Sequence, residues 1–161
     1  MEEIINEILK FSDKILTLGA PILDDRIERF EKKYNLSLPL DFHVILSRYN
    51  GINIMGTEIY GFHNNSPNSI EDTYEFEHFK TAVPQWRHLV PFSPDGGGSF
   101  YCLDLSKSNS EECSIVFWVS NFQYSDSDQP EIVNVNLTDW IRQVMIGWTL
   151  EEYNYDGTSK S

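Results

Sequence analysis

A run of three glycines, Gly96 to Gly98, is the most prominent candidate for chemistry, because glycine-rich loops can cradle phosphates. A Walker loop continues into Gly-Lys-Ser/Thr at the head of a helix, and a dinucleotide loop has the pattern Gly-x-Gly-x-x-Gly before one. Here a strand-like segment, 100–105, follows the glycines, and the carboxylate of Asp95 before them would repel a phosphate. The pattern therefore predicts a tight turn with glycines at positive φ.

The two cysteines, Cys102 and Cys113, are the candidate nucleophiles, and a catalytic thiol would need a base such as His88 or His43 beside it. Cys102 alternates with Phe100 in a strand-like segment, which predicts a packed side chain. No catalytic signature surrounds either thiol. Buried, reduced thiols are expected, with a disulfide as the alternative.

A metal site would require several converging ligands, and the four histidines and two cysteines show neither His-x-x-x-His nor Cys-x-x-Cys spacing. His78 with Glu75, about one helical turn apart, is the best pair, and two ligands are too few. The acidic residues could include a carboxylate pair for glycoside hydrolysis, but no spacing selects one. We expect no metal and no cofactor.

The chain carries 25 acidic and 12 basic residues, a formal net charge of −13. Nucleic-acid binding needs clustered Lys and Arg, so we expect no nucleic-acid partner, and anionic membrane surfaces are disfavoured for the same reason. The N-terminus lacks the features of a secretion signal, and no stretch approaches the roughly 18–20 apolar residues of a membrane span. We therefore expect a soluble cytoplasmic protein. Its acidity either serves solubility alone or attracts a protein partner with a basic surface.

Two acidic segments are the candidate partner-binding surface. The first lies in a predicted short helix over 70–79, which Ser69 could cap, and the second is the polar loop before the strand-like segment 131–135. Acids there would pair with Lys and Arg of the partner, and aromatic side chains would anchor the contact. A solvated surface role is the alternative for each acid, and a core role for the tryptophan. The candidates are Glu71, Asp72, Glu75, Glu77, Trp86, Tyr124, Asp126, Asp128 and Glu131.

Hydrophobic periodicity predicts three helices in the first third of the chain. The first ends at 19–21, and its apolar stripe comprises Ile4, Ile5, Ile8, Leu9, Ile15 and Leu16. The second begins at Asp24-Asp25, whose carboxylates suit a helix N-terminus, and stops at Asn35. Its stripe is expected to start at Leu23.

The third helix is predicted to open at Leu38-Pro39, where proline loses no hydrogen bond, and to close at Asn50-Gly51, where glycine supplies the left-handed conformation. The period then changes to that of strands, expected over 58–62, 100–105, 113–119 and 131–135, with Val133 and Val135 facing inward. A final helix follows, which Thr138 can cap, with an apolar stripe of Trp140, Ile141, Val144, Met145 and Trp148.

Helices, then strands, then a closing helix indicate an α+β fold. We expect an antiparallel sheet of about four to six strands flanked by the N-terminal helices and a C-terminal helix. The length suits one hydrophobic core, which predicts a single domain over 1–155 followed by a flexible tail, 156–161.

Several of these segments, taken in order, resemble the SUKH superfamily. The N-terminal signature is an acidic helix (Asp25–Glu31), a Leu-Pro step (Leu38–Phe42) and an Asn-Gly end (Tyr49–Gly51). Leu89–Phe92 and Asp95–Asp104 resemble the central motif, in which a strand with a proline leads into an acidic, glycine-rich turn and a strand ending in Asp. The residues that carry the likeness are Leu38, Pro39, Asn50, Gly51, Pro91, Asp95, Gly97, Gly98 and Asp104.

The resemblance spans roughly Asp24 to Trp148, with two departures. Ser99 stands where the family often has an acid, and Ser93-Pro94 fills a position often held by glycine. The likeness implies an antiparallel sheet flanked by helices. It also implies one of two roles: bacterial relatives resemble immunity proteins that block a toxin, and fungal relatives act as regulators or scaffolds in cell-wall synthesis.

Three hypotheses for function follow. The first is a non-enzymatic protein-binding domain, an immunity protein that neutralises a cognate toxin such as a nuclease. The second is a regulatory scaffold related to cell-wall synthesis regulators. The third is an enzyme of unknown type.

Overall fold

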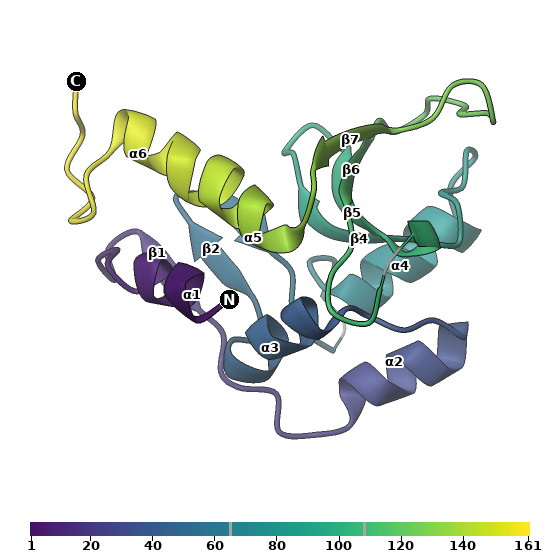
Figure 1. Ribbon diagram of the computed structural model, residues 1–161, viewed down its shortest axis with the longest axis horizontal. Coiled ribbons are helices and arrows are strands. Elements are labelled where there is room, and N and C mark those ends of the chain that lie inside the picture. The colour runs from purple at the N-terminus through teal and green to yellow at the C-terminus, as the bar shows by residue number, and fades with distance from the viewer. Residues whose placement is uncertain (65, 108) are drawn as a thin grey trace.

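The computed structural model describes residues 1–64, 66–107 and 109–161, and it shows helices packed around two antiparallel sheets (Figure 1). The first sheet consists of β1 (Leu16–Leu18), β2 (Ile52–Ile54) and β3 (Thr57–Ile59). The second consists of β4 (Leu89–Pro94), β5 (Phe100–Asp104), β6 (Ile115–Trp118) and β7 (Glu131–Asn134). The helical elements are α1 (Glu2–Ile8), α2 (Arg26–Tyr34), α3 (Leu40–Arg48), α4 (Ile70–Phe79), η1 (Leu105–Lys107), α5 (Leu137–Trp140), η2 (Ile141–Gly147) and α6 (Trp148–Glu152).

The predicted α+β class and antiparallel pairing are confirmed, and the strands are divided between two sheets instead of one. The sheets are linked just after β3, where the Tyr60 main-chain N–H donates to the Phe92 carbonyl oxygen of β4 at 2.8 Å. This link lets one core extend across both sheets.

The first helix is shorter than predicted. It ends at Ile8, and Leu16 belongs to β1, where it pairs with Ile54. The helical spacing of Ile15 and Leu16 is coincidental, because β1 becomes a strand through its pairing with β2. The sequence pattern missed β2, whose three residues are too few to show alternation.

The second and third helices follow the prediction closely. α2 ends at Tyr34, and Asn35 after it adopts a left-handed conformation with φ 52°. α3 ends earlier than predicted, at Arg48, because Tyr49 is already extended; Gly51 has φ 98° but lies beyond the helix and does not close it. Pro39 is the last extended residue before α3. Leu23 does not join the apolar stripe, because it precedes the helix and is 94% exposed.

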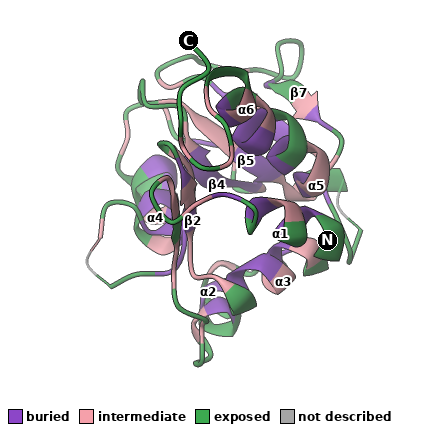
Figure 2. Cartoon of the chain, turned by 90° about the vertical axis from the view of Figure 1, so that its left-hand side faces the viewer, coloured by how far each residue is buried: buried purple, intermediate pink, exposed green. Residues whose placement is uncertain are grey.

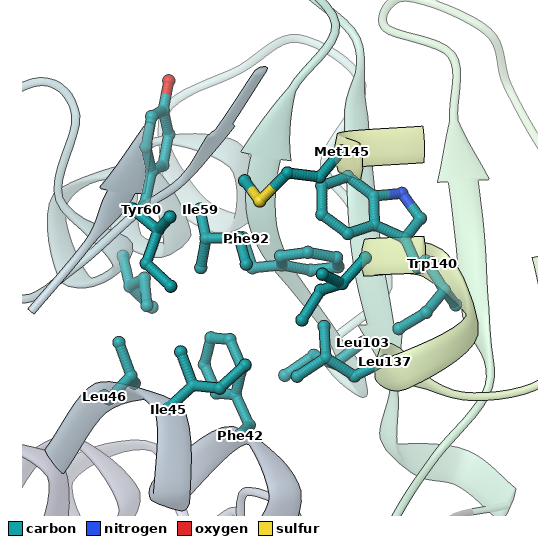
Figure 3. Packing of buried hydrophobic residues seen from close by; sticks show 14 of the residues in the cluster. Phe42, Ile45, Leu46, Ile59, Tyr60, Phe92, Leu103, Leu137, Trp140 and Met145 are labelled. Atoms are coloured by element: carbon teal, nitrogen blue, oxygen red, sulfur yellow. The ribbon is translucent and has the colours of Figure 1, made fainter. Parts of the chain in front are cut away.

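The main core lies between α3, the inner face of the four-stranded sheet and the C-terminal helical run (Figure 3). The rings of Phe92 and Trp140 meet edge to face with centroids 4.9 Å apart, and Phe42 packs against the other side of Phe92 at 5.9 Å. Figure 2 shows buried residues concentrated on the inner sides of these elements. The fully buried members of this region include Phe42, Ile45, Leu46, Ile59, Phe92, Leu103, Leu137, Trp140 and Met145.

The C-terminal helix exists as predicted, but two details differ. Its cap is Asn136, whose Oδ1 accepts a hydrogen bond from the Asp139 N–H at 2.9 Å, so Thr138 is not the cap. The middle of the run, η2, is π-helical, and the wider i→i+5 turn displaces Trp148 from the apolar stripe. Trp148 is consequently 51% exposed.

Of the two residues predicted to face inward from the last strand, Val133 packs against the main core as expected, but the prediction for Val135 is wrong. Val135 lies just beyond β7 and is 68% exposed, whereas Asn134 is buried and its Nδ2 donates to Gln143 Oε1 at 2.9 Å. An irregularity in the pairing of β6 with β7, between Ile115 and Val116, changes the facing of β7 residues.

The last residues of the chain bond to α6 and to the segment just after it. The Asn154 N–H donates to the Thr158 carbonyl oxygen at 2.8 Å, and the Lys160 N–H donates to the Glu152 carbonyl oxygen at 2.8 Å. These contacts give the tail defined partners; its flexibility in solution and the domain boundary at residue 155 stay predictions.

Candidate functional site

A groove of about 770 Å³ separates α4 from the turn that joins β4 to β5. Thr73 and Phe76 of α4 line one side, Gly97 and Gly98 of the turn line the other, and Phe100 of β5 contributes an aromatic ring. We call this feature the α4 groove. It brings the predicted acidic helix together with the predicted glycine turn, two features that are separate in the sequence.

α4 has the bounds that the sequence predicts, 70–79, and it is fixed by buried residues. Ile70 is fully buried, and the Tyr74 hydroxyl donates to the Arg87 carbonyl oxygen at 2.8 Å. Ser69 precedes the helix without capping it, because its Oγ accepts a hydrogen bond from the His63 N–H instead. The helix is therefore positioned by packing and by the segment that follows it.

His78 is a structural residue that ties α4 to this following segment. It is 3% exposed, with Nδ1 2.7 Å from the Tyr74 carbonyl oxygen and Nε2 3.0 Å from the Trp86 carbonyl oxygen. Burial lowers its pKa. Glu75, the metal partner considered for it, instead pairs with Lys80 at 3.1 Å. Across the described ranges, no three His, Cys, Asp or Glu side chains gather as a metal site would require.

The acids on the outer face of α4 have partners within the protein. Lys33 of α2 lies 3.0 Å from Glu71 and 3.4 Å from Glu75. The hydrogen bond with Lys80 is the main reason that the pKa of Glu75 is lowered. Asp72 is exposed and lines the groove. Three of the four predicted acids therefore remain on an accessible surface, two of them as members of ion pairs.

Glu77 is the exception, and its predicted exposure is wrong. The residue is only 7% exposed, because the chain after α4 folds back over it and the Gln85 N–H donates to the Glu77 carbonyl oxygen at 2.9 Å. Burial raises the pKa of its carboxyl group. The side chain nevertheless lines the α4 groove.

The glycine run forms the tight turn that the sequence predicts. The Asp95 carboxylate accepts hydrogen bonds from the Gly97 N–H at 2.7 Å and the Ser99 N–H at 2.9 Å. Gly96 and Gly98 have φ of 82° and 100°, a conformation that favours glycine. Because Asp95 occupies these N–H groups, the turn offers no cradle to a phosphate.

The second predicted surface, around Tyr124, adjoins the α4 groove, because Val83 lines both that groove and a smaller pocket that Tyr124 lines. The Tyr124 ring packs against Trp118 at 4.6 Å and Trp86 at 6.3 Å, and its Oη accepts a hydrogen bond from the Val119 N–H. Trp86 is half-buried and packs against a small core cluster of the second sheet, which consists of Leu89, Cys102, Val116 and Trp118. Its structural role is therefore plain. The exposed acids of this segment are Asp126, Asp128 and Glu131.

Several residues shared with the SUKH motifs organise turns. Asn50 is an example: its Oδ1 accepts from the Phe62 N–H at 2.6 Å and its Nδ2 donates to the Phe62 carbonyl oxygen at 2.9 Å. Asp104 accepts from the Ser106 N–H at 3.0 Å. Pro91 stands beside a bulge in the pairing of β4 with β5, and Leu38 is buried.

Both cysteines are free and buried, as predicted. Burial raises the pKa of Cys113 to about 12 and that of Cys102 well above its usual value. The Cys102 Sγ donates a weak hydrogen bond to Gln85 Oε1 at 3.7 Å. Protonated, enclosed thiols are poor nucleophiles, so neither site has the properties of a catalytic cysteine.

Sequence reasoning missed several groove residues, among them Phe76, Val83 and Phe100. Phe76 carried a usable signal. The helical spacing places it outside the buried stripe of α4, which runs through Ile70 and Tyr74, so an aromatic side chain there is expected to face outward. In the structure Phe76 is 53% exposed. Val83 and Phe100 reach the groove through tertiary contacts that the sequence pattern does not reveal.

A family model, SUKH_5, described as SMI1-KNR4 cell-wall, matches residues 1–146. The chain belongs to the SUKH superfamily. This SUKH protein also resembles a solved structure, titled crystal structure of protein from Pseudomonas syringae pv. tomato, with a TM-score of 0.59 and 16% sequence identity. The alignment covers 89% of this chain and 97% of the other, so the two share a fold.

A comparison with curated proteins gave no match to the SUKH chain. None of the helices in the described ranges combines the length and apolar character needed to cross a bilayer.

Proposed function

We propose that this SUKH protein is a non-enzymatic binding domain that acts in the cytoplasm as an immunity protein and neutralises a cognate toxin. The observation that carries the proposal is the α4 groove. An exposed aromatic ring, Phe76, stands beside the acids Asp72 and Glu75, and the opposite side is a turn without bulky side chains. Aromatic anchors surrounded by charged groups are typical of protein interfaces.

The proposed mechanism is occlusion of a basic cleft on the toxin, such as the active site of a nuclease. The net charge of −13 would draw the positively charged toxin toward the acidic surface and raise the rate of association. Steric cover of the cleft would then exclude its substrate. A role without catalysis agrees with three features of the protein: both thiols are buried, the Asp95 carboxylate accepts hydrogen bonds from the glycine turn, and the histidines are scattered.

The test is growth rescue. The toxin encoded by the neighbouring gene is expressed with wild-type protein, with a groove variant (Asp72→Lys, Glu75→Lys) or with a control (Glu151→Lys, Glu152→Lys) that has the same change of charge on α6. We expect wild type and control to restore growth and the groove variant to fail while remaining folded. Equal rescue by all three proteins would contradict this site.

A second candidate is a regulatory scaffold, which the cell-wall description of the matched family favours. It would use the same groove to hold a different protein. Genomic position discriminates: a gene directly after a toxin gene supports the immunity role, and an isolated gene supports the scaffold.

A further inference from the structure

Glu77 is the acid of α4 that lies inward and has no cation beside it. The residue is 7% exposed, and no hydrogen bond or ion pair joins its carboxylate to any residue within 1–64, 66–107 or 109–161. Glu71 and Glu75, by contrast, pair with Lys33 and Lys80 on the outer face. A buried carboxylate without a partner is costly, and proteins usually supply one.

Glu77 lines the α4 groove. Behind it lies the small core of the second sheet, where Cys102 is fully buried and its thiol pKa is raised by burial and then by the negative charge of Glu77. Among the described residues, this small core comprises Leu89, Cys102, Val116 and Trp118, none of which is a cation. The groove is therefore the side from which a counter-charge can reach Glu77.

The groove suits a cation that is also flat and partly apolar. The rings of Phe76 and Phe100 line it, together with Val83, whereas its lysine, Lys80, is already paired with Glu75 at 3.1 Å. A guanidinium group stacks on aromatic rings and pairs with a carboxylate through two parallel hydrogen bonds. Gly97 and Gly98 present no side chains, so a partner's main chain can approach closely.

We propose that the α4 groove receives an arginine side chain of the partner protein and pairs its guanidinium group with the Glu77 carboxylate. The inference rests on the proposed function and specifies the chemistry of the partner: an arginine on a segment that can follow the groove past the glycine turn. The other acids at the rim attract the partner, and Glu77 recognises the inserted residue.

The first experiment uses a small probe, N-acetyl-L-argininamide, titrated into the full chain and followed by NMR of main-chain amides. We expect shifts at Phe76, Gly97 and Gly98, and weaker binding by about tenfold or more in Glu77→Gln. Glu71→Gln is the matched control, because Glu71 is on the same helix but does not line the groove. N-acetyl-L-citrullinamide, similar in shape but uncharged, should cause no such shifts.

Thermal unfolding separates recognition from a structural role. Replacing an unpaired buried carboxylate with an amide removes a cost, so Glu77→Gln is expected to unfold at the same temperature as wild type or higher at pH 7. A lower unfolding temperature together with unchanged probe binding would overturn the inference.

The growth assay then distinguishes this inference from the proposed function. If Glu77→Gln neutralises the toxin as well as wild type does, the arginine pairing is wrong while the immunity role stands. If no toxin is neutralised but the probe binds in a Glu77-dependent manner, the immunity role is wrong and the groove still recognises a guanidinium group.

Discussion

Asn50 offers a sharp test of how the SUKH motif stabilises the fold. Its side chain amide pairs with both main-chain groups of Phe62, a residue that is only 2% exposed. In Asn50→Ala the Phe62 N–H loses its acceptor, whereas the Phe62 carbonyl oxygen keeps a second donor, Arg26 Nη1, at 3.0 Å. One orphaned buried group costs about 1–3 kcal/mol, so we expect a loss of about 2 kcal/mol in the free energy of unfolding.

The assay is urea unfolding followed by tryptophan fluorescence, since Trp118 and Trp140 are almost fully buried. In a chain of this size, a loss of about 2 kcal/mol also lowers the unfolding temperature by about 4–8 °C. Asn53→Ala is the control: Asn53 Oδ1 accepts from the Gly56 N–H in an exposed turn, and its loss should cost less than about 1 kcal/mol. If the Asn50→Ala protein is as stable as the Asn53→Ala protein or more stable, the reasoning is refuted.

Further predictions concern the same neighbourhood, a buried acid and the thiols. A Cβ at Gly61 would overlap with Asn50, so Gly61→Ala should destabilise the protein by about 1–3 kcal/mol in the same urea assay. Burial raises the pKa of Asp41 from 3.8 to about 6, so the folded protein binds this proton more tightly than the unfolded chain does. The resulting stabilisation of the fold is fully present below pH 3.8 and is lost as the pH rises through 6. Asp41→Asn should therefore gain about 1–2 kcal/mol at pH 7, after allowance for its solvent-exposed part, and little at pH 4, which unfolding curves at the two pH values check. Cys102 and Cys113 should react with a thiol reagent only after unfolding; rapid modification of the native protein would contradict their burial.

Much of the fold was predictable because several elements carry their own local signals. The bounds of α4 follow from its apolar spacing, and the end of α2 follows from Asn35, whose left-handed conformation stops the helix. The predicted stop of α3 at Gly51 lies beyond the true end, because the chain is already extended at Tyr49. The glycine turn was also predictable, because Asp95 and the glycines after it suit a tight turn irrespective of what surrounds them.

Other features depend on contacts between distant segments. Leu16 continues a helical pattern yet pairs with Ile54 as a strand. The π-helical turns of η2 have no sequence signal that marks them, and they leave Trp148 exposed.

The candidate site divides in the same way. Acidic residues on α4 were predicted as a surface, and Glu71, Asp72 and Glu75 lie there, but Glu77 is buried because the segment containing Gln85 bonds back to the helix. The meeting of α4 with the turn at Gly97 is a property of the tertiary fold alone.

Hydrogen–deuterium exchange of the protein alone and in complex with its cognate toxin tests the central claim most directly, because it reports which segments the partner covers. The account predicts slower exchange in α4 and in residues 96–100 when the toxin is bound. Slower exchange confined to residues 124–131, with α4 unchanged, would contradict it.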